Sequence, residues 1–237
     1  MIIGRPHIHH RTVGSTNQVA RELAVNGAPS GTVVSSEEQT AGRGRQGRPW
    51  ATPAGSSLAW SAILRKEVEV PGTLPLQVGV AVCEAVEALG VPRAEVKWPN
   101  DIWIVGRKCA GILVEARLQE GWVVIGVGLN LSIADDQFPD EIRGRATSVG
   151  HGSTIASATD ALNRALGARL AAPEHESMAE FTRRDALRGR TVSWAEGTGT
   201  AAGIDLEGNL LVQSSAGCLT SLNAGEVHLA VNRPDDA

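Results

Sequence analysis

Apolar residues recur at helical spacing in four parts of the chain. Ser15 and Gln18 have the form of a capping box at the start of the first stretch, and Gly27 is placed to end it. Gly90 follows the second stretch in the same way. The spacing predicts helices over 15–26, 76–89, 157–170 and 173–187.

Short apolar runs between these stretches read as β-strands. The predicted strands cover 33–34, 58–64, 96–98, 102–105, 110–115 and 122–131. Turn-forming residues separate the last four runs, which indicates an antiparallel meander. The segments 40–50 and 134–152 are polar and rich in turn formers, so we expect two long loops, and loops of such length are more often functional than decorative.

The sequence pattern changes after residue 187. Four short β-runs broken by glycines follow, which predicts a small all-β unit. Its predicted strands cover 191–194, 200–204, 210–212 and 227–231. We therefore expect two domains, over 1–187 and 188–237.

Composition narrows the function classes. The 237 residues include 22 Lys or Arg and 26 Asp or Glu, and the net charge of -4 does not favour bulk attraction to nucleic acid or to an anionic membrane. The cysteines are Cys83, Cys109 and Cys218; their number and spacing argue against a disulfide framework or a zinc knuckle. We expect no membrane span and no signal peptide, and a reducing cytoplasm fits.

Glycine and arginine alternate at 42–48, before Pro49 and Trp50. Glycine lets the backbone approach a ligand closely, and guanidinium groups reach its anionic oxygens. A phosphate or a carboxylate suits this segment. A solvated loop or an arm that grips nucleic acid is the alternative, and Trp50 is then a hydrophobic anchor.

Two neighbouring segments add polar chemistry. Pro99 ends strand pairing, which places Asn100 and Asp101 at a strand edge beside a cleft. Lys108 lies just after a predicted turn and just before the predicted strand 110–115, where its ammonium can meet developing negative charge. The alternatives are surface lysines at 97 and 108 and a turn-forming Asp101.

Other patterns give weaker signals. The run 126–130 has two glycines but not the third of a dinucleotide fingerprint, and a glycine-lined strand against which another group packs is as probable. His7, His9 and His10 lie at what we expect to be a frayed terminus without a supporting carboxylate, so we expect no protein-bound metal. No Gly-x-Ser-x-Gly motif of a hydrolase is present.

Four motifs in a fixed order carry a resemblance to a known family. They are Gly-Arg-Gly-Arg-x-Gly-Arg-x-Trp at 42–50, Lys-Trp-Pro-Asn-Asp at 97–101, Lys-x-Ala-Gly-Ile-Leu-Val-Glu at 108–115 and Gly-Val-Gly-Leu-Asn at 126–130, after Ser-Thr-Asn-Gln at 15–18. Together they resemble the catalytic unit of biotin protein ligases. The resemblance implies an α+β fold, in which a mixed β-sheet flanked by helices, of the class II synthetase-like type, precedes a small C-terminal SH3-like β-barrel.

The resemblance also implies a two-step reaction. Biotin and ATP, with Mg²⁺ on the triphosphate, give biotinyl-5'-AMP, and a lysine of a biotin carboxyl carrier protein then takes the biotinyl group. The implied catalytic residues are Lys108, Arg43 and Asp101. The implied biotin-binding residues are Ser15, Thr16, Asn17, Gln39, Arg43, Gly44, Arg45, Lys108 and Gly111. For ATP and the adenylate they are Arg43, Arg45, Arg48, Trp50, Lys97, Asn100, Lys108 and Asn130. The loop around Phe138 is expected to cover the adenine.

Some expectations concern partners. Only 14 residues precede Ser15, too few for a helix-turn-helix, so we expect neither operator binding nor repression. Gln46 stands where a basic residue is common in the family, which bears on the strength of anion binding. The chain is either a monomer or a homodimer. Two rival functions are a lipoate or octanoate ligase or transferase, and a nucleic-acid-binding protein, for which 3% aromatic residues offer little stacking surface.

Overall fold

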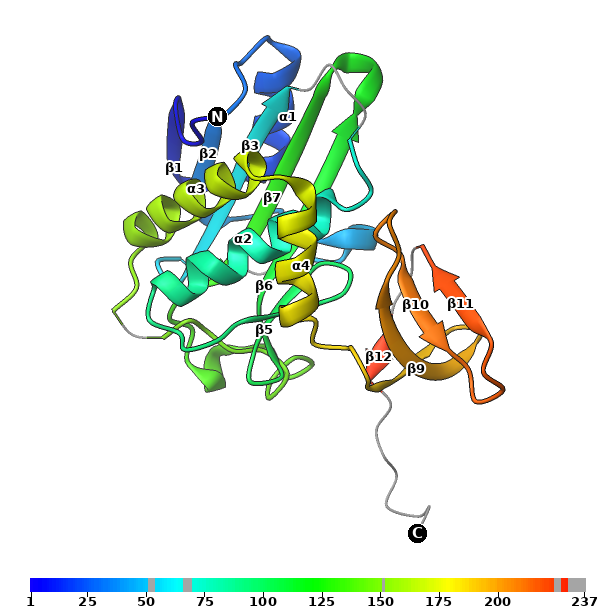
Figure 1. The fold of residues 1–237 in the computed structure, drawn as a ribbon. Helices are drawn as coiled ribbons and strands as arrows, with labels where there is room; N and C mark the ends of the chain where they lie inside the picture. Colours follow the sequence, from blue (N-terminus) through cyan, green and yellow to red (C-terminus); the bar gives the residue numbers. More distant parts are fainter. Residues whose placement is uncertain (51–53, 66–69, 151, 224–226, 230–237) are drawn as a thin grey trace.

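A seven-stranded mixed sheet forms the centre of the molecule (Figure 1). The computed structural model describes residues 1–50, 54–65, 70–150, 152–223 and 227–229. The strand order is β1-β2-β3-β7-β6-β5-β4. The strands are β1 (His7–Val13), β2 (Val33–Gln39), β3 (Ser57–Arg65), β4 (Glu95–Lys97), β5 (Asp101–Ile104), β6 (Arg107–Arg117) and β7 (Trp122–Asn130). Strands β4 to β7 pair consecutively and antiparallel, which confirms the predicted meander.

The N-terminal histidines belong to the sheet, so the expectation of a frayed terminus was wrong. Strand β1 pairs in parallel with β2, with His7 opposite Val33 and His10 opposite Ser36. The segment is polar on both faces, which gives it little of the alternation that marks a strand in sequence. Its position depends on β2, which lies more than twenty residues away in the chain.

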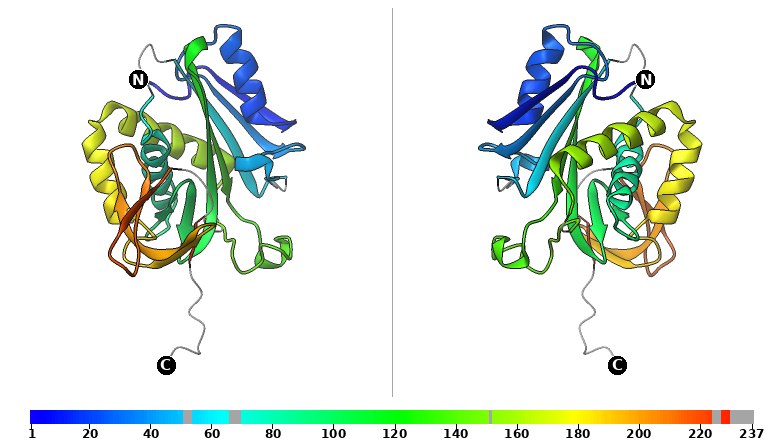
Figure 2. Two further views of the ribbon diagram at one scale, coloured as in Figure 1. Left: turned by 90° about the vertical axis from the view of Figure 1, so that its right-hand side faces the viewer. Right: turned by 90° about the vertical axis from the view of Figure 1, so that its left-hand side faces the viewer.

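Helices cover both faces of the sheet (Figure 2). Helix α1 (Thr16–Val25) lies on one face, where Ala20 and Ala24 pack against Val34 of β2, Ile63 of β3 and Val124 of β7. Helices α2 (Leu74–Ala88), α3 (Ile155–Ala171) and α4 (Glu174–Arg184) lie on the other side. The mixed sheet flanked by helices is therefore confirmed.

Two details of the helices differ from the prediction. Ser15 precedes α1, but its side chain caps no backbone N–H, so the capping box is wrong. Helix α4 ends at Arg184, short of the predicted Leu187, because the chain turns to pair with β4 there. Asp185 forms an isolated bridge with Val96, and the Ala186 N–H donates to the Val96 carbonyl at 3.0 Å.

A second sheet follows in the chain and has the order β11-β10-β9-β8-β12. Its antiparallel strands are β8 (Thr191–Trp194), β9 (Gly197–Ile204), β10 (Leu210–Gln213), β11 (Leu219–Leu222) and β12 (His228–Leu229). Strand β11 was not predicted, and residues 230–231 of the last predicted strand lie outside the described residues. The sheet fits the expected C-terminal β unit; closure into a barrel and the boundary at 187 stay predictions.

Trp98 connects the two sheets. Its buried indole Nε1 donates to the Gly208 carbonyl at 3.0 Å, in the turn between β9 and β10. Gly208 in turn lies against Gly72, just before α2, since an added Cβ there would stand 3.1 Å from the Gly72 carbonyl oxygen. Buried residues of the second sheet, including Val192 and Leu210, belong to the same core cluster as Trp98.

No helix among the described residues is both long and apolar enough to cross a lipid bilayer.

Candidate active site

Small residues on three adjacent strands form an open floor on the α1 face of the sheet. Val124 of β7 packs against α1, and side chains alternate along a strand, so Gly126 and Gly128 point to the same face. Gly128 lies between Ala59 of β3 and Gly111 of β6. Glycine and alanine leave room above the sheet that larger side chains would fill. The interpretation of 126–130 as a glycine-lined strand against which another group packs is confirmed.

Gly126 accommodates the side chain of Asn17 from the first turn of α1. A Cβ at Gly126 would stand 2.1 Å from Asn17 Oδ1. Ser61 Oγ, which is fully buried on β3, lies 2.7 Å from this oxygen and 2.8 Å from Thr16 Oγ1. Thr16 Oγ1 lies 3.2 Å from Gln39 Oε1 at the end of β2, and the Thr16 N–H donates to the same oxygen at 2.8 Å. A continuous chain of hydrogen-bonding groups therefore lines one end of the floor.

The arginine-glycine segment folds into a closed loop at the other end of the floor. Arg43 and Pro49 form an antiparallel bridge, and the Trp50 N–H donates to the Gly42 carbonyl at 3.0 Å. A short 3₁₀ turn, Arg45–Gly47, forms its tip, where Gln46 adopts a left-handed φ of 56°. Such a conformation is uncommon for residues other than glycine.

Trp50 lies across the glycine floor. Its ring atoms stand 2.3 Å from the position of a Cβ at Gly128 and 3.1 Å from that of a Cβ at Gly111. The two glycines therefore give the indole the space it needs. The indole Nε1 is buried and has no hydrogen-bond partner among the described residues.

Lys108 lies beside this indole and over the same glycine, because its Cε and Nζ stand 3.4 Å from the position of a Cβ at Gly111. Its Nζ stands 5.4 Å from the Trp50 ring centroid and 2.6 Å from Asp101 Oδ1 on β5. The polar segment after β7 holds the backbone of Lys108 on both sides, because its N–H donates to the Arg145 carbonyl and its carbonyl accepts from the Thr147 N–H, each at 2.8 Å. Lys108 is thus fixed at both its main chain and its ammonium.

The loop meets the Lys-Trp-Pro-Asn-Asp motif through Arg45. Its Nη1 donates to Asn100 Oδ1 at 3.3 Å, and Asn100 Nδ2 donates to the Ile112 carbonyl of β6 at 3.0 Å. Burial lowers the pKa of the Arg45 guanidinium, while the Asp101 carboxylate opposes this effect. The two segments that the sequence set apart, 42–50 and 97–115, therefore meet at one place.

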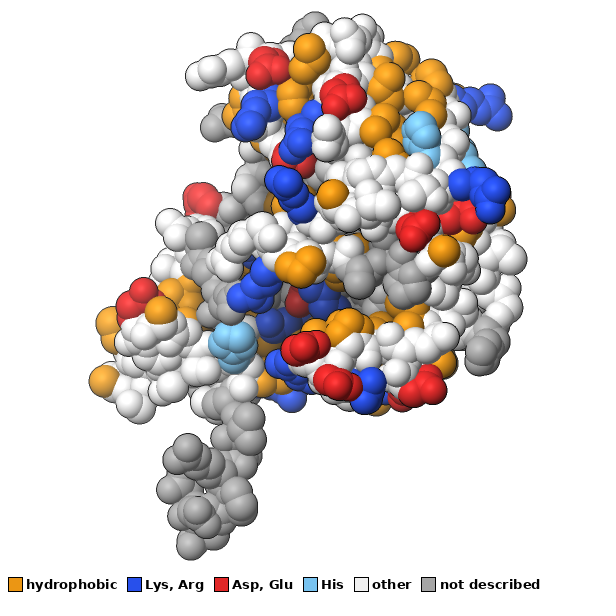
Figure 3. Space-filling view, turned by 180° about the vertical axis from the view of Figure 1, so that it is seen from behind, with side chains coloured by type: hydrophobic (Ala, Val, Ile, Leu, Met, Phe, Trp, Pro, Cys, Tyr) orange, Lys and Arg blue, Asp and Glu red, His pale blue; other side chains and the backbone are white. Residues whose placement is uncertain are grey.

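Several cations share this place. Burial lowers the pKa of the Lys97 ammonium, and the Asp101 carboxylate opposes that effect. The pKa falls further through three other cations, those of Lys108, Arg45 and Arg48. In Figure 3, Lys and Arg side chains gather around a hollow in the middle of the face that carries α1. This excess of positive charge around one carboxylate suits a ligand with several anionic oxygens.

Other predicted site residues lie less centrally. Arg43 is exposed, and its side chain has no hydrogen bond or ion pair with the described residues. Ser15, just before α1, is half-buried, and Arg48 is exposed. Asn130 is buried, and its Nδ2 donates to the Thr147 carbonyl at 3.0 Å, so it holds the segment after β7.

Phe138 belongs to a small apolar cluster after β7. It is buried in a small cluster with Ile133 and Ala146, inside the segment that was predicted as a long loop. The expectation that this loop covers an adenine stays a prediction.

The donor set for a metal is sparse. In the part of the chain that the structure describes, no three His, Cys, Asp or Glu side chains lie together as metal ligands do. His7 Nε2 and His9 Nδ1 both contact Ser35 Oγ, at 2.8 and 2.9 Å, on the face opposite α1.

Comparison with known proteins decides the family. A sequence model of the biotin/lipoate A/B protein ligase family matches residues 10–131, just over half of the chain. The chain belongs to this family. The match covers the residues between the four motifs as well, and so supports the predicted resemblance to biotin protein ligases.

Individual relatives agree with this family. The chain is 41% identical over 157 residues to "Bifunctional ligase/repressor BirA" of Bacillus spizizenii, covering 64% of this chain and 48% of the relative. It is 39% identical over 189 residues to "Biotin--[acetyl-CoA-carboxylase] ligase" of Mycobacterium tuberculosis, covering 76% and 62%. The chain thus spans about half to three fifths of the length of these relatives.

A solved structure extends the likeness to the whole fold. The biotin protein ligase from Aquifex aeolicus, in complex with biotin and ATP, superposes with a TM-score of 0.81 at 28% identity, covering 94% of this chain and 98% of that one. The second sheet is included in a match of this extent.

Sequence reasoning missed Ser61 and Glu115 as partners of the site. Asn17 Nδ2 donates to Glu115 Oε2 at 2.7 Å, although 98 residues separate them. Glu115 stood in one of the four motifs but carried no predicted role. The register of β3, β7 and β6 brings Ser61 and Glu115 under α1. No local sequence pattern indicates that register.

Proposed function

We propose that this family member is a biotin protein ligase that forms biotinyl-5'-AMP from biotin and ATP and transfers the biotinyl group to a lysine. The observation that carries the proposal is the meeting of Lys108 and the arginine-glycine loop above a glycine floor that ends in the hydrogen-bonding chain from Gln39 to Asn17. The hydrogen-bonding chain suits the polar ring end of biotin, and the cations suit the phosphates of ATP.

The first step needs charge compensation. A carboxylate oxygen of biotin attacks the α-phosphorus of ATP, a new C–O–P link forms, and the bond to pyrophosphate breaks. Negative charge accumulates on the phosphoryl oxygens, and a preorganised cation stabilises it. Lys108 is the principal candidate because Asp101 and Trp50 hold its ammonium in place. Arg45 lies next to it through Asn100, and exposed Arg43 stays a predicted contributor.

The second step needs a neutral amine. The lysine nitrogen of the acceptor attacks the carbonyl carbon of the anhydride, AMP leaves, and the amine loses its proton. Asp101 is the candidate acceptor or orienter of that amine, although its ion pair with Lys108 already occupies one carboxylate oxygen. The proposed acceptor is the biotin carboxyl carrier domain of a carboxylase, as the name of the Mycobacterium tuberculosis relative suggests. Since the reaction uses ATP and such a carboxylase, we place it in the cytoplasm.

One assay separates this function from its rivals. The chain is incubated with labelled biotin, ATP and Mg²⁺, with lipoate as the parallel substrate, and adenylate formation and acceptor labelling are followed. The proposal expects biotinyl-5'-AMP and a labelled carrier domain. Exclusive use of lipoate would assign the chain to the other branch of the family, and no adenylate from either acid would refute the proposal.

A further inference from the structure

Strands β4 and β5 form a hairpin at the edge of the main sheet, next to the strand that carries Lys108. Val96 of β4 and Ile102 of β5 are opposite each other and fully buried, and both lie against Gly79 of α2. Side chains alternate along a strand, so the neighbouring residues point to the other face, on the side of α1. The hairpin therefore turns one face to the core and the other toward the candidate active site.

The outer face of this hairpin carries charged residues and one tryptophan. Lys97 pairs with Asp101 across the two strands, and Glu95 pairs with Trp103. Helix α1 contacts β2, β3 and β7, whereas α2 contacts β4 and β5 from the core side. Trp103 is partly exposed, and the Lys97 Nζ stands 5.8 Å from its ring centroid. The indole N–H of Trp103 has no hydrogen-bond partner among the described residues.

The turn between β5 and β6 exposes a valine at its tip. Ile104 and Arg107 are opposite each other, so Val105 and Gly106 form a two-residue turn, with left-handed φ values of 48° and 73°. Such a turn favours asparagine and glycine, and a β-branched residue is an outlier in it. Val105 is 90% exposed. Neither the backbone nor the core accounts for a valine here, which directs attention to a contact outside the chain.

Trp103 and Val105 both lie close to Lys108. Trp103 is opposite Lys108 in the pairing of β5 with β6, and neighbouring strands are about 5 Å apart. Val105 precedes Lys108 by three residues, which is at most about 10 Å of extended chain. A lysine side chain extends only about 6 Å from its Cα. A lysine of another protein that reaches an acyl group held at Lys108 therefore brings its own backbone against these two residues.

We propose that Trp103 and Val105 form the docking surface for the acceptor protein, where they contact apolar side chains around its lysine. The inference rests on the proposed function, whose second step needs a protein amine at this place. The unpartnered indole N–H then donates to a carbonyl oxygen of the acceptor. Tryptophan is enriched among the residues that carry most of the binding energy of an interface. The docking surface sets the affinity for the acceptor and takes no part in adenylate formation.

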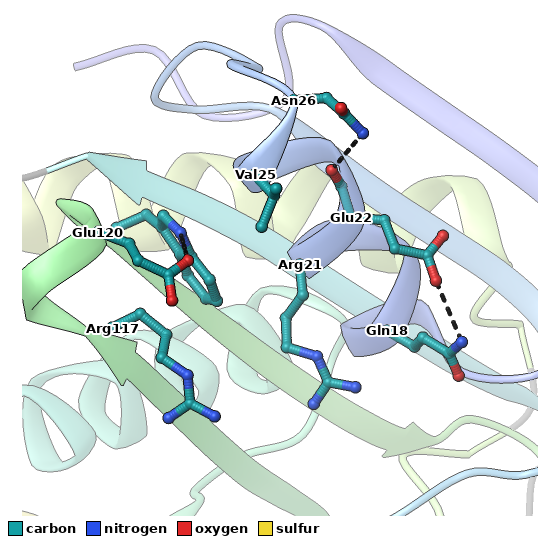
Figure 4. A pocket seen from close by; sticks show the side chains of 8 residues that line it. Gln18, Arg21, Glu22, Val25, Asn26, Arg117 and Glu120 are labelled. Atoms are coloured by element: carbon teal, nitrogen blue, oxygen red, sulfur yellow. Dashed lines mark hydrogen bonds between the residues drawn. The ribbon is translucent and has the colours of Figure 1, made fainter.

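A hollow of about 450 Å³ offers a rival surface between α1 and the turn that joins β6 to β7 (Figure 4). Val25, which is 67% exposed, lines it together with Arg21 and Arg117. Arg117 follows Gly111 by six residues, or about 20 Å along β6, which exceeds the reach of one lysine side chain. Arg21 already pairs with Glu115 at 2.6 Å. The hollow is therefore the less suitable place for the acceptor and provides a matched control.

Val105→Asn and Val25→Asn form a matched pair of substitutions at exposed valines, and Trp103→Ala removes the indole. Asparagine tolerates the left-handed conformation, so Val105→Asn is expected to fold at least as well as the wild type. Each variant first forms biotinyl-5'-AMP without an acceptor and then transfers the biotinyl group to a biotin carboxyl carrier protein at varied concentration. Discharge of the bound adenylate by hydroxylamine, a small nucleophile that needs no docking, measures the chemical step alone.

The expected result is a loss of affinity for the carrier protein alone. Its KM is expected to rise at least about 10-fold in Trp103→Ala and about threefold in Val105→Asn, with adenylate formation and hydroxylamine discharge within about twofold of the wild type. Val25→Asn is expected to change none of the three.

Three results would overturn the inference alone. They are an unchanged KM in either Trp103→Ala or Val105→Asn, an equal rise in Val25→Asn, and hydroxylamine discharge that slows as much as the transfer. If Trp103→Ala does not fold, Val105→Asn decides. A wild-type chain that forms no biotinyl-5'-AMP overturns the proposed function and this inference with it.

Discussion

Replacement of Gly126 by alanine is expected to destabilise the site from its floor. The added Cβ would stand 2.1 Å from Asn17 Oδ1 and 2.8 Å from Asn17 Cγ. The Gly126 backbone is not in the left-handed region, so the clash is the main cost. Carbon and oxygen atoms in contact stay about 3.4 Å apart or more, and the amide must therefore move by about 1 Å. Both 2.7 Å hydrogen bonds of Asn17, with Ser61 and with Glu115, are then lost or stretched.

The size of the effect follows from these two hydrogen bonds. A neutral hydrogen bond contributes about 1 kcal/mol and one to a charged group about 1.5–3 kcal/mol, so the free energy of unfolding is expected to fall by about 2–4 kcal/mol. Urea titration measures it, with Gly14→Ala as the control, because a Cβ at Gly14 meets nothing within 4 Å. Biotin affinity is expected to fall at least about tenfold in parallel. A Gly126→Ala chain as stable as Gly14→Ala would refute the placement of Asn17 on this glycine.

Three further perturbations test other parts of the structure. Lys108→Met keeps an unbranched side chain that is one atom shorter and removes the charge. At about 4 Å and an effective dielectric of about 20, the interaction of two unit charges is worth about 4 kcal/mol, so adenylate formation is expected to fall about 10³-fold in a rapid-quench assay. Wild-type rates would remove Lys108 from the mechanism. Trp98→Phe loses the hydrogen bond to Gly208 and is expected to lower the free energy of unfolding by about 1–3 kcal/mol, whereas an unchanged value would show that the indole N–H does not stabilise the contact between the sheets. Burial and the neighbouring His9 lower the pKa of His7, so the folded state resists protonation of this side chain. The free energy of unfolding is therefore expected to decline as pH falls below about 6.5. His7→Gln is expected to flatten that decline in thermal scans, and a variant with the pH profile of the wild type would contradict this expectation.

The helices were predictable because their signals are local. The repeat before Gly90 and the glycine after the first helix lie within the segments they describe, and α1 and α2 agree with the prediction to within about two residues. Strand β1 was not predictable in this way, since its polar sequence forms a strand only through pairing with β2. The Thr154–Ser157 capping box of α3 exists, whereas the one suggested at Ser15 does not, which shows that a short motif does not determine its own hydrogen bonds.

The residues of the site could be predicted from the sequence, but the contacts between their side chains could not. Glycines at 111, 126 and 128 and cations at 45 and 108 stood in recognisable motifs. That Gly126 lies under Asn17 while Gly128 lies under Trp50 depends on the register of β6 and β7, which the sequence does not display. Trp98 belongs to the same motif as Asn100, yet its indole N–H donates to the Gly208 carbonyl of the second sheet and not to a residue of the site. Motif membership therefore located the site without assigning each residue its task.

The central claim is that Arg45 and Lys108, from two separate segments, act on one acyl phosphate. A double-mutant cycle of Arg45→Gln and Lys108→Met in the rate of biotinyl-5'-AMP formation measures it most directly. Two groups that stabilise the same developing charge are expected to be coupled, so the double variant should differ from the sum of the single effects by more than about 1 kcal/mol. Additivity to within about 0.5 kcal/mol would contradict the claim, because it would mean that the two cations work at independent places.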